Sequence, residues 1–109
     1  MQKNKCKLRY LPLFYEDLEQ KLSYIADELK NPTAAFNLLD GVEHAIKERL
    51  NMPEAYEPYE SSKERKYPYY RIYVENFVIY YVVIDEGASG KYMEVRRFLY
   101  KGQDREEIV

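Results

Sequence analysis

The pattern of hydrophobic and polar positions divides the chain into one strand, two helices and three further strands. From Lys3 to Leu11 polar and apolar residues alternate, with a lysine or arginine at every second position, which predicts a strand with one basic face. That basic face suits either an exposed sheet edge protected against pairing or a binding surface. Apolar residues then recur at helical spacing from Phe14 to Leu29 and from Ala35 to Leu50. Asn31-Pro32 ends the first helix and can cap the second.

The stretch from Tyr69 to Tyr100 predicts a meander of three strands, because it is rich in tyrosine, valine, isoleucine and phenylalanine. Glu75-Asn76 and the Asp85 to Gly90 segment interrupt it with residues that favour turns. Phe77 to Ile84 is almost continuously apolar, as is typical of a central strand covered on both faces. One face of this sheet is expected to be core, and the other can meet a partner.

The segment from Asn51 to Pro68 predicts a long surface loop, since it contains three prolines and the mixed charged run Glu60 to Lys66. Loops of this length are often functional, although a solvated linker has the same composition. Two of its cations, Lys63 and Arg65, are candidate target-binding residues.

These elements predict an α+β fold in one domain spanning residues 1–109: a small antiparallel sheet in the order β-α-α-β-β-β, with a helical hairpin packed on one face. The alternation on the second predicted strand places Tyr70, Ile72 and Val74 on the core face. It places Arg71 and Tyr73 on the other face, which we expect to be basic and rich in tyrosine.

Composition narrows the classes of function. With 46% hydrophobic and 33% charged residues the chain is typical of a globular protein, and its single cysteine excludes an internal disulfide. No long apolar run or leader-like segment is present, so we expect a cytoplasmic protein with no membrane association. We also expect no metal and no cofactor, because no cysteine–histidine cluster or glycine-rich phosphate loop occurs.

Charge is unevenly distributed along the chain. The formal net charge of −2 does not support a uniformly basic surface for a polyanion. The segment from Lys91 to Arg105, however, holds five basic and two acidic residues. It is therefore a local basic patch on the last predicted strand.

Three pieces of sequence in this order resemble the RelE/ParE superfamily of bacterial toxins, the toxic halves of type II toxin–antitoxin pairs. They are the helix ending from Leu50 to Pro53, the strand pair from Arg71 to Asp85 and the segment VRRFLYKGQD from Val95 to Asp104. The resemblance covers nearly the whole chain and implies a cognate antitoxin, acidic and partly disordered, that folds over the sheet and hairpin. It also implies one of two targets, mRNA on the ribosome or DNA gyrase.

For the branch that cleaves mRNA, the resemblance gives the chain an incomplete catalytic set. Metal-free cleavage needs a proton acceptor, a proton donor and cations for the phosphorane charge. Arg71 and Arg97 match phosphate-binding positions, and Tyr100 stands where the family has a histidine. Val78 and Gly102-Gln103, in contrast, occupy positions where cleaving relatives carry arginine.

Three functions remain open from the sequence. The first is a toxin that inhibits translation by ribosome-dependent mRNA cleavage, with Arg71, Arg97 and Tyr100 as catalytic residues. The second is a ParE-like gyrase inhibitor without nuclease activity, which the missing arginines favour. The third is a degenerate toxin that retains only antitoxin binding, which the mildly acidic charge favours. The RNA- or target-binding candidates are Tyr73, Tyr81, Lys101, Lys63 and Arg65.

Overall fold

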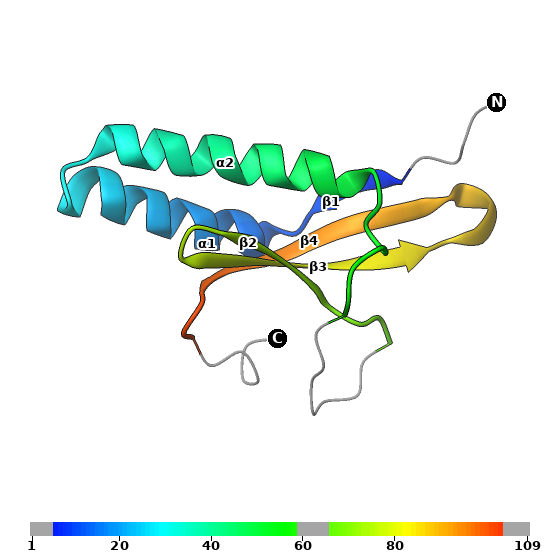
Figure 1. Ribbon diagram of the computed structural model, residues 1–109. Helices are drawn as coiled ribbons and strands as arrows, with labels where there is room; N and C mark the ends of the chain where they lie inside the picture. Colours follow the sequence, from blue (N-terminus) through cyan, green and yellow to red (C-terminus); the bar gives the residue numbers. More distant parts are fainter. Residues whose placement is uncertain (1–5, 59–65, 104–109) are drawn as a thin grey trace.

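A computed structural model describes residues 6–58 and 66–103. The elements, in chain order, are β1 (Lys7–Tyr10), α1 (Pro12–Ser23), a π-helical turn (Tyr24–Glu28), α2 (Pro32–Leu50), β2 (Tyr70–Val74), β3 (Phe77–Asp85), a 3-10 turn (Gly87–Ser89) and β4 (Lys91–Tyr100). Helices α1 and α2 form a hairpin over one face of a four-stranded sheet with the strand order β1-β4-β3-β2 (Figure 1). The predicted α+β class, element order and helical hairpin are confirmed.

The sheet differs from the expectation in one respect, because it is mixed and not wholly antiparallel. Strand β1 runs parallel to β4, with Lys7 opposite Tyr92 and Tyr10 opposite Val95, whereas β2, β3 and β4 form antiparallel pairs. A tight turn forces neighbouring strands to be antiparallel, but β1 leads into the helical hairpin and is free of that constraint. Residue alternation along β1 carries no information about its direction.

Local signals set the ends of both helices. Pro12 occupies the first turn of α1, where its missing N–H costs nothing. The α-helical part of the first helix ends at Ser23, and the π-helical turn carries the chain on to Glu28. The side chain of Asn31 then accepts a hydrogen bond of 3.1 Å from the backbone N–H of Ala34, which caps α2 as the sequence predicted.

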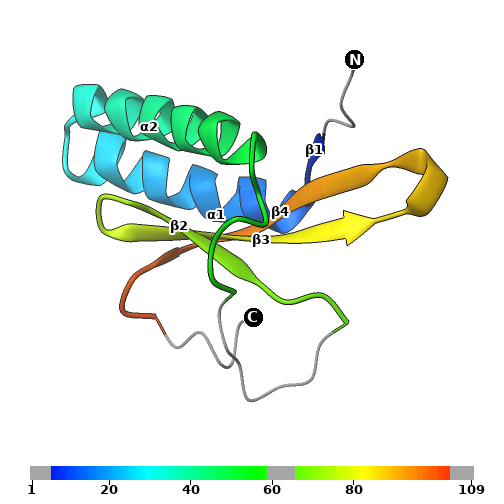
Figure 2. The same cartoon turned by 45° about the vertical axis from the view of Figure 1, so that its right-hand side comes forward.

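The two faces of the sheet hold separate buried clusters, and Figure 2 shows α1 and α2 together on one side of it. On the helix side the core includes Phe14, Leu38, Val42, Ile46, Ile79 and Phe98. On the opposite side, called the far face below, a smaller cluster contains Tyr69, Val78, Tyr80, Val82 and Leu99. Strand β3 is therefore buried on both faces, which confirms its prediction as the central strand.

A bulge in β4 changes which side chains share a face. Tyr80 pairs with Arg97 and Tyr81 pairs with Val95, so Arg96 is an extra residue in the ladder. Val95 and Phe98 both belong to the helix-side core. Arg96 and Arg97 consequently fill the interval between two core residues, a placement that simple alternation does not predict.

Candidate functional site

Two of the predicted cations lie near a third predicted residue, Tyr73, on the far face. The Arg71 guanidinium carbon lies 5.9 Å from the centroid of the Tyr73 ring, and Lys101 Nζ lies 5.7 Å from it. Tyr73 is 53% exposed and lies opposite Val78, a member of the far-face cluster. The backbone N–H of Lys101 bonds to the carbonyl of Asn76 at 2.9 Å, which fixes the start of its segment. We call Arg71, Tyr73 and Lys101 the Tyr73 cluster.

Arg97 and Arg71 both lie opposite Tyr80 in the sheet, on either side of β3, but the Arg97 side chain forms an ion pair with α1. Its Nε donates to Asp17 Oδ2 at 2.7 Å and its Nη2 to Asp17 Oδ1 at 2.9 Å. The same carboxylate accepts a third bond of 3.0 Å from the backbone N–H of Phe98. The bond to Asp17 raises the pKa of Arg97 above its ordinary value. Strand β1 pairs with β4 only as far as Val95. Beyond that residue Asp17 attaches α1 to the edge of β4, and Arg97 is part of this attachment.

Tyr100 faces the helix side. Its ring centroid lies 4.9 Å from that of Phe77, a residue of the helix-side core, and 5.3 Å from Lys21 Nζ on α1. The ring is 42% exposed, and the backbone N–H of Tyr100 donates to Gln103 Oε1 at 2.7 Å. Tyr100 and the Tyr73 cluster thus lie on opposite faces of the sheet.

Tyr81 is buried in the helix-side core rather than displayed on the surface that was expected. Its hydroxyl donates to the carbonyl of Pro53 at 2.7 Å and accepts from Arg49 Nη1 at 2.9 Å. Its ring stacks on Tyr70 with centroids 5.2 Å apart, and burial raises the pKa of its phenol. No face of this ring is available for a nucleobase, because the side chain is 0% exposed.

Arg49 organises this region, although it was not among the candidates from the sequence. Its Nη1 also donates to the backbone carbonyl of Arg71 at 3.0 Å, and its guanidinium carbon lies 3.6 Å from the centroid of the Tyr56 ring. Arg49 therefore connects the end of α2 to the edge strand β2 and to Tyr56 in the segment that follows α2. The only sequence signal for it was its position directly before the Leu50 to Pro53 helix ending.

Lys63 and Arg65 lie outside the described residues. Val78, which stands where cleaving relatives have arginine, is 0% exposed within the far-face cluster. Residue 78 is therefore a packing position in this chain.

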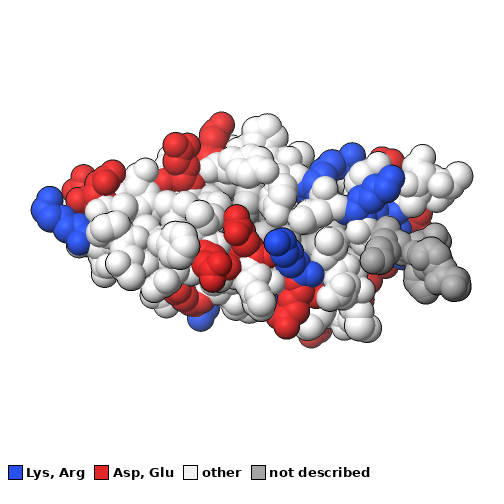
Figure 3. Space-filling model, turned by 90° about the horizontal axis from the view of Figure 1, so that it is seen from above, with Lys and Arg blue, Asp and Glu red and all other residues white. Residues whose placement is uncertain are grey.

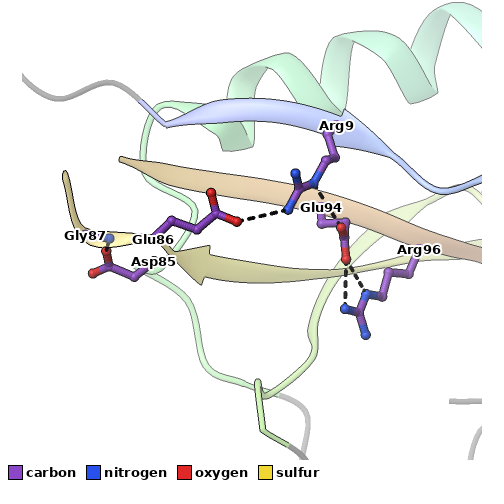
Figure 4. Close-up of polar contacts among 6 residues, drawn as sticks. All are labelled: Arg9, Asp85, Glu86, Gly87, Glu94 and Arg96. Carbon is purple, nitrogen blue, oxygen red and sulfur yellow. Dashed lines mark hydrogen bonds and ion pairs between the residues drawn. The ribbon is translucent and has the colours of Figure 1, made fainter. Parts of the chain in front are cut away.

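The basic patch expected on β4 is partly neutralised. Glu94 accepts from Arg9 Nε at 3.0 Å and from Arg96 Nε at 2.8 Å, and Arg9 also approaches Glu86 at 3.8 Å (Figure 4). The Glu94 side chain is only 9% exposed, so both arginines are paired with a nearly buried carboxylate. The Arg9 guanidinium also lies 4.1 Å from the centroid of the Tyr92 ring.

The helix side carries a different charge pattern. Acidic groups lie along the helices among broad uncharged areas (Figure 3).

In the part of the chain that the structure describes, no group of three or more histidine, cysteine, aspartate or glutamate residues could hold a metal ion. Neither of the described helices is long and apolar enough to cross a membrane.

A solved structure shares the fold of this chain, and a family model matches its sequence. The fold is similar to that of a solved structure of the chromosomal ParDE toxin–antitoxin system from P. aeruginosa, with a TM-score of 0.67 and 13% identity over 90% of this chain and 98% of that chain. Residues 8–104 match the model of the ParE toxin of the type II toxin–antitoxin system parDE. The chain therefore belongs to the ParE toxin family within the RelE/ParE superfamily, and an antitoxin is its partner. No curated protein matches the sequence.

Proposed function

We propose that this toxin acts as a ParE-type inhibitor of DNA gyrase, through surface contacts and without cleaving RNA. The observation that carries the proposal is that the side chains of the three candidate catalytic residues make different contacts and are not directed to one site. Arg71 belongs to the far face, Tyr100 to the helix side, and Arg97 to the ion pair with Asp17.

Metal-free RNA cleavage requires these groups to converge on a single phosphate. The general acid, the general base and the cations must each come within hydrogen-bond reach of the reacting atoms. Two nitrogens of Arg97 already donate hydrogen bonds to the Asp17 carboxylate, whose side chain is 8% exposed. Recruiting it to a phosphate would leave that carboxylate buried and unpaired on the Arg97 side, which is costly. The arrangement therefore supports a structural role for Arg97 and a non-enzymatic toxin.

Ribosome-dependent mRNA cleavage remains the second candidate, because one observation favours it. The Tyr73 cluster combines an exposed ring with two cations, a combination that stacks on a base and neutralises the adjacent phosphates. The same surface also suits an acidic protein partner, so the cluster does not select RNA by itself.

Induced expression without the antitoxin separates the two mechanisms. A gyrase inhibitor is expected to trigger the DNA-damage response while protein synthesis continues at first, whereas an mRNA-cleaving toxin stops translation immediately. Arg71→Ala and Tyr100→Phe serve as matched variants, because neither residue belongs to the Asp17 ion pair. Immediate translational arrest that both variants abolish would contradict the proposal. Absence of any growth defect would favour a degenerate toxin that only binds its antitoxin.

A further inference from the structure

Lys21 places a positive charge in the seam between α1 and β4. It follows Asp17 by one helical turn and is only 7% exposed. Asp17 directs its carboxylate to β4, where it accepts the two bonds from Arg97 and the one from the Phe98 backbone. Among the residues that the structure describes, none forms a hydrogen bond or an ion pair with the Lys21 ammonium.

The surroundings of this ammonium favour the arrival of an anion. The ring of Tyr100 lies near this ammonium, with its centroid 5.3 Å from Nζ. Desolvation lowers the pKa of Lys21, and the like charge of Arg97 lowers it further, against an opposing effect of Asp17. A desolvated cation without an anionic partner is costly. A carboxylate or phosphate reaching Nζ would remove that cost.

The neighbouring side chains favour a protein carboxylate over nucleic acid. A groove of about 480 Å³ on the adjacent part of α1 is lined by Glu16, Glu19, Gln20 and Ser23. A nucleic-acid strand carries a charge at every nucleotide and would meet the two glutamates. Leu13 and Tyr24 lie at helical spacing before and after Asp17 and Lys21, and about half of each side chain is exposed. They offer apolar contacts to a segment that carries one acidic residue.

We propose that Lys21 and the Tyr100 ring form the docking site for one aspartate or glutamate side chain of the antitoxin. The inference rests on membership of the toxin–antitoxin family and holds whether the toxin acts on gyrase or on mRNA. The acidic side chain pairs with the Lys21 ammonium while the flanking residues of its segment contact Leu13, Tyr24 and Tyr100.

The test compares two lysine variants of the whole toxin. Lys21→Met removes the charge and keeps the length of the side chain, whereas Lys47→Met removes a charge from an exposed position of α2. The affinity for the antitoxin encoded beside the toxin gene is measured by calorimetry, and thermal unfolding checks that each variant is folded. We expect Lys21→Met to weaken binding by about tenfold or more and Lys47→Met to change it by less than about twofold. Lys21→Arg is expected to retain most of the affinity.

Two results would overturn the site: wild-type antitoxin affinity in Lys21→Met, and an equal loss in both methionine variants. If Lys21→Met keeps wild-type antitoxin affinity but loses binding to a uridine oligonucleotide, Lys21 contacts nucleic acid instead. A wild-type toxin that binds no co-encoded protein would instead overturn the antitoxin partnership. If the toxin does not inhibit gyrase, the antitoxin affinities of the two lysine variants still test the Lys21 site.

Discussion

Replacing Asp17 with asparagine should cost much of the stability of this toxin. Asp17 is 8% exposed at its side chain, Arg97 is 20% exposed, and the carboxylate accepts three hydrogen bonds of 2.7–3.0 Å. Asparagine has the same shape but presents an amide donor to one of these donors and leaves the Arg97 charge without its partner. Breaking a buried pair in this way costs about 3 kcal/mol, against a total stability of about 5–15 kcal/mol for a domain of this kind.

Urea unfolding followed by circular dichroism measures this loss. With a slope of about 1.5 kcal/mol per molar urea, the midpoint should fall by about 2 M. The control is Glu86→Gln, because the Arg9–Glu86 pair is long at 3.8 Å and both side chains are about 40% exposed. That change should cost less than about 0.5 kcal/mol. A loss below about 1 kcal/mol in Asp17→Asn would refute the assignment of Asp17 and Arg97 as the attachment of α1 to β4.

Three further predictions concern the other polar contacts. Arg49→Met should destabilise the fold by about 2 kcal/mol in urea unfolding, because it removes two hydrogen bonds and the stacking on Tyr56; unchanged stability would contradict the role of Arg49. Burial raises the pKa of Tyr81 above its ordinary 10.0, so the neutral phenol is favoured in the folded state. Stability should be constant below that value and fall as the pH rises above it, and Tyr81→Phe should make the fall shallower in unfolding measured across alkaline pH. Glu94→Gln removes the carboxylate that Arg9 and Arg96 share, and it should delay elution from a heparin column to higher salt; unchanged elution would show that these arginines do not face the polyanion.

The sequence predicted most of the fold because its signals are local. The apolar run of β3 indicated a strand covered on both faces, and the Asn31 side chain caps α2 as expected. The alternation along β2 correctly placed Ile72 in the helix-side core and Tyr73, which is 53% exposed, on the opposite face of the sheet. Each of these features depends on residues within a few positions of one another.

The candidate site could be predicted only in part, since its remaining determinants are distant in sequence. Asp17 lies 80 residues from Arg97, and no pattern along either segment indicates their pairing. The continuous apolar run of β3 has no alternation, so the face of Tyr81 was undefined until its pairing with Tyr70 was known. The bulge at Arg96 shifts the register of β4 by one residue, which a count along the strand does not anticipate.

The central proposal is that this ParE-family toxin inhibits gyrase and does not cleave mRNA. The most direct measurement adds the purified toxin to two reactions in parallel, DNA supercoiling by gyrase and translation of a defined mRNA by purified ribosomes. We expect the toxin to inhibit supercoiling while the mRNA stays intact in primer extension, and added antitoxin to reverse the inhibition. Ribosome-dependent cleavage of the mRNA with supercoiling unaffected, abolished by Arg71→Ala, would contradict the proposal.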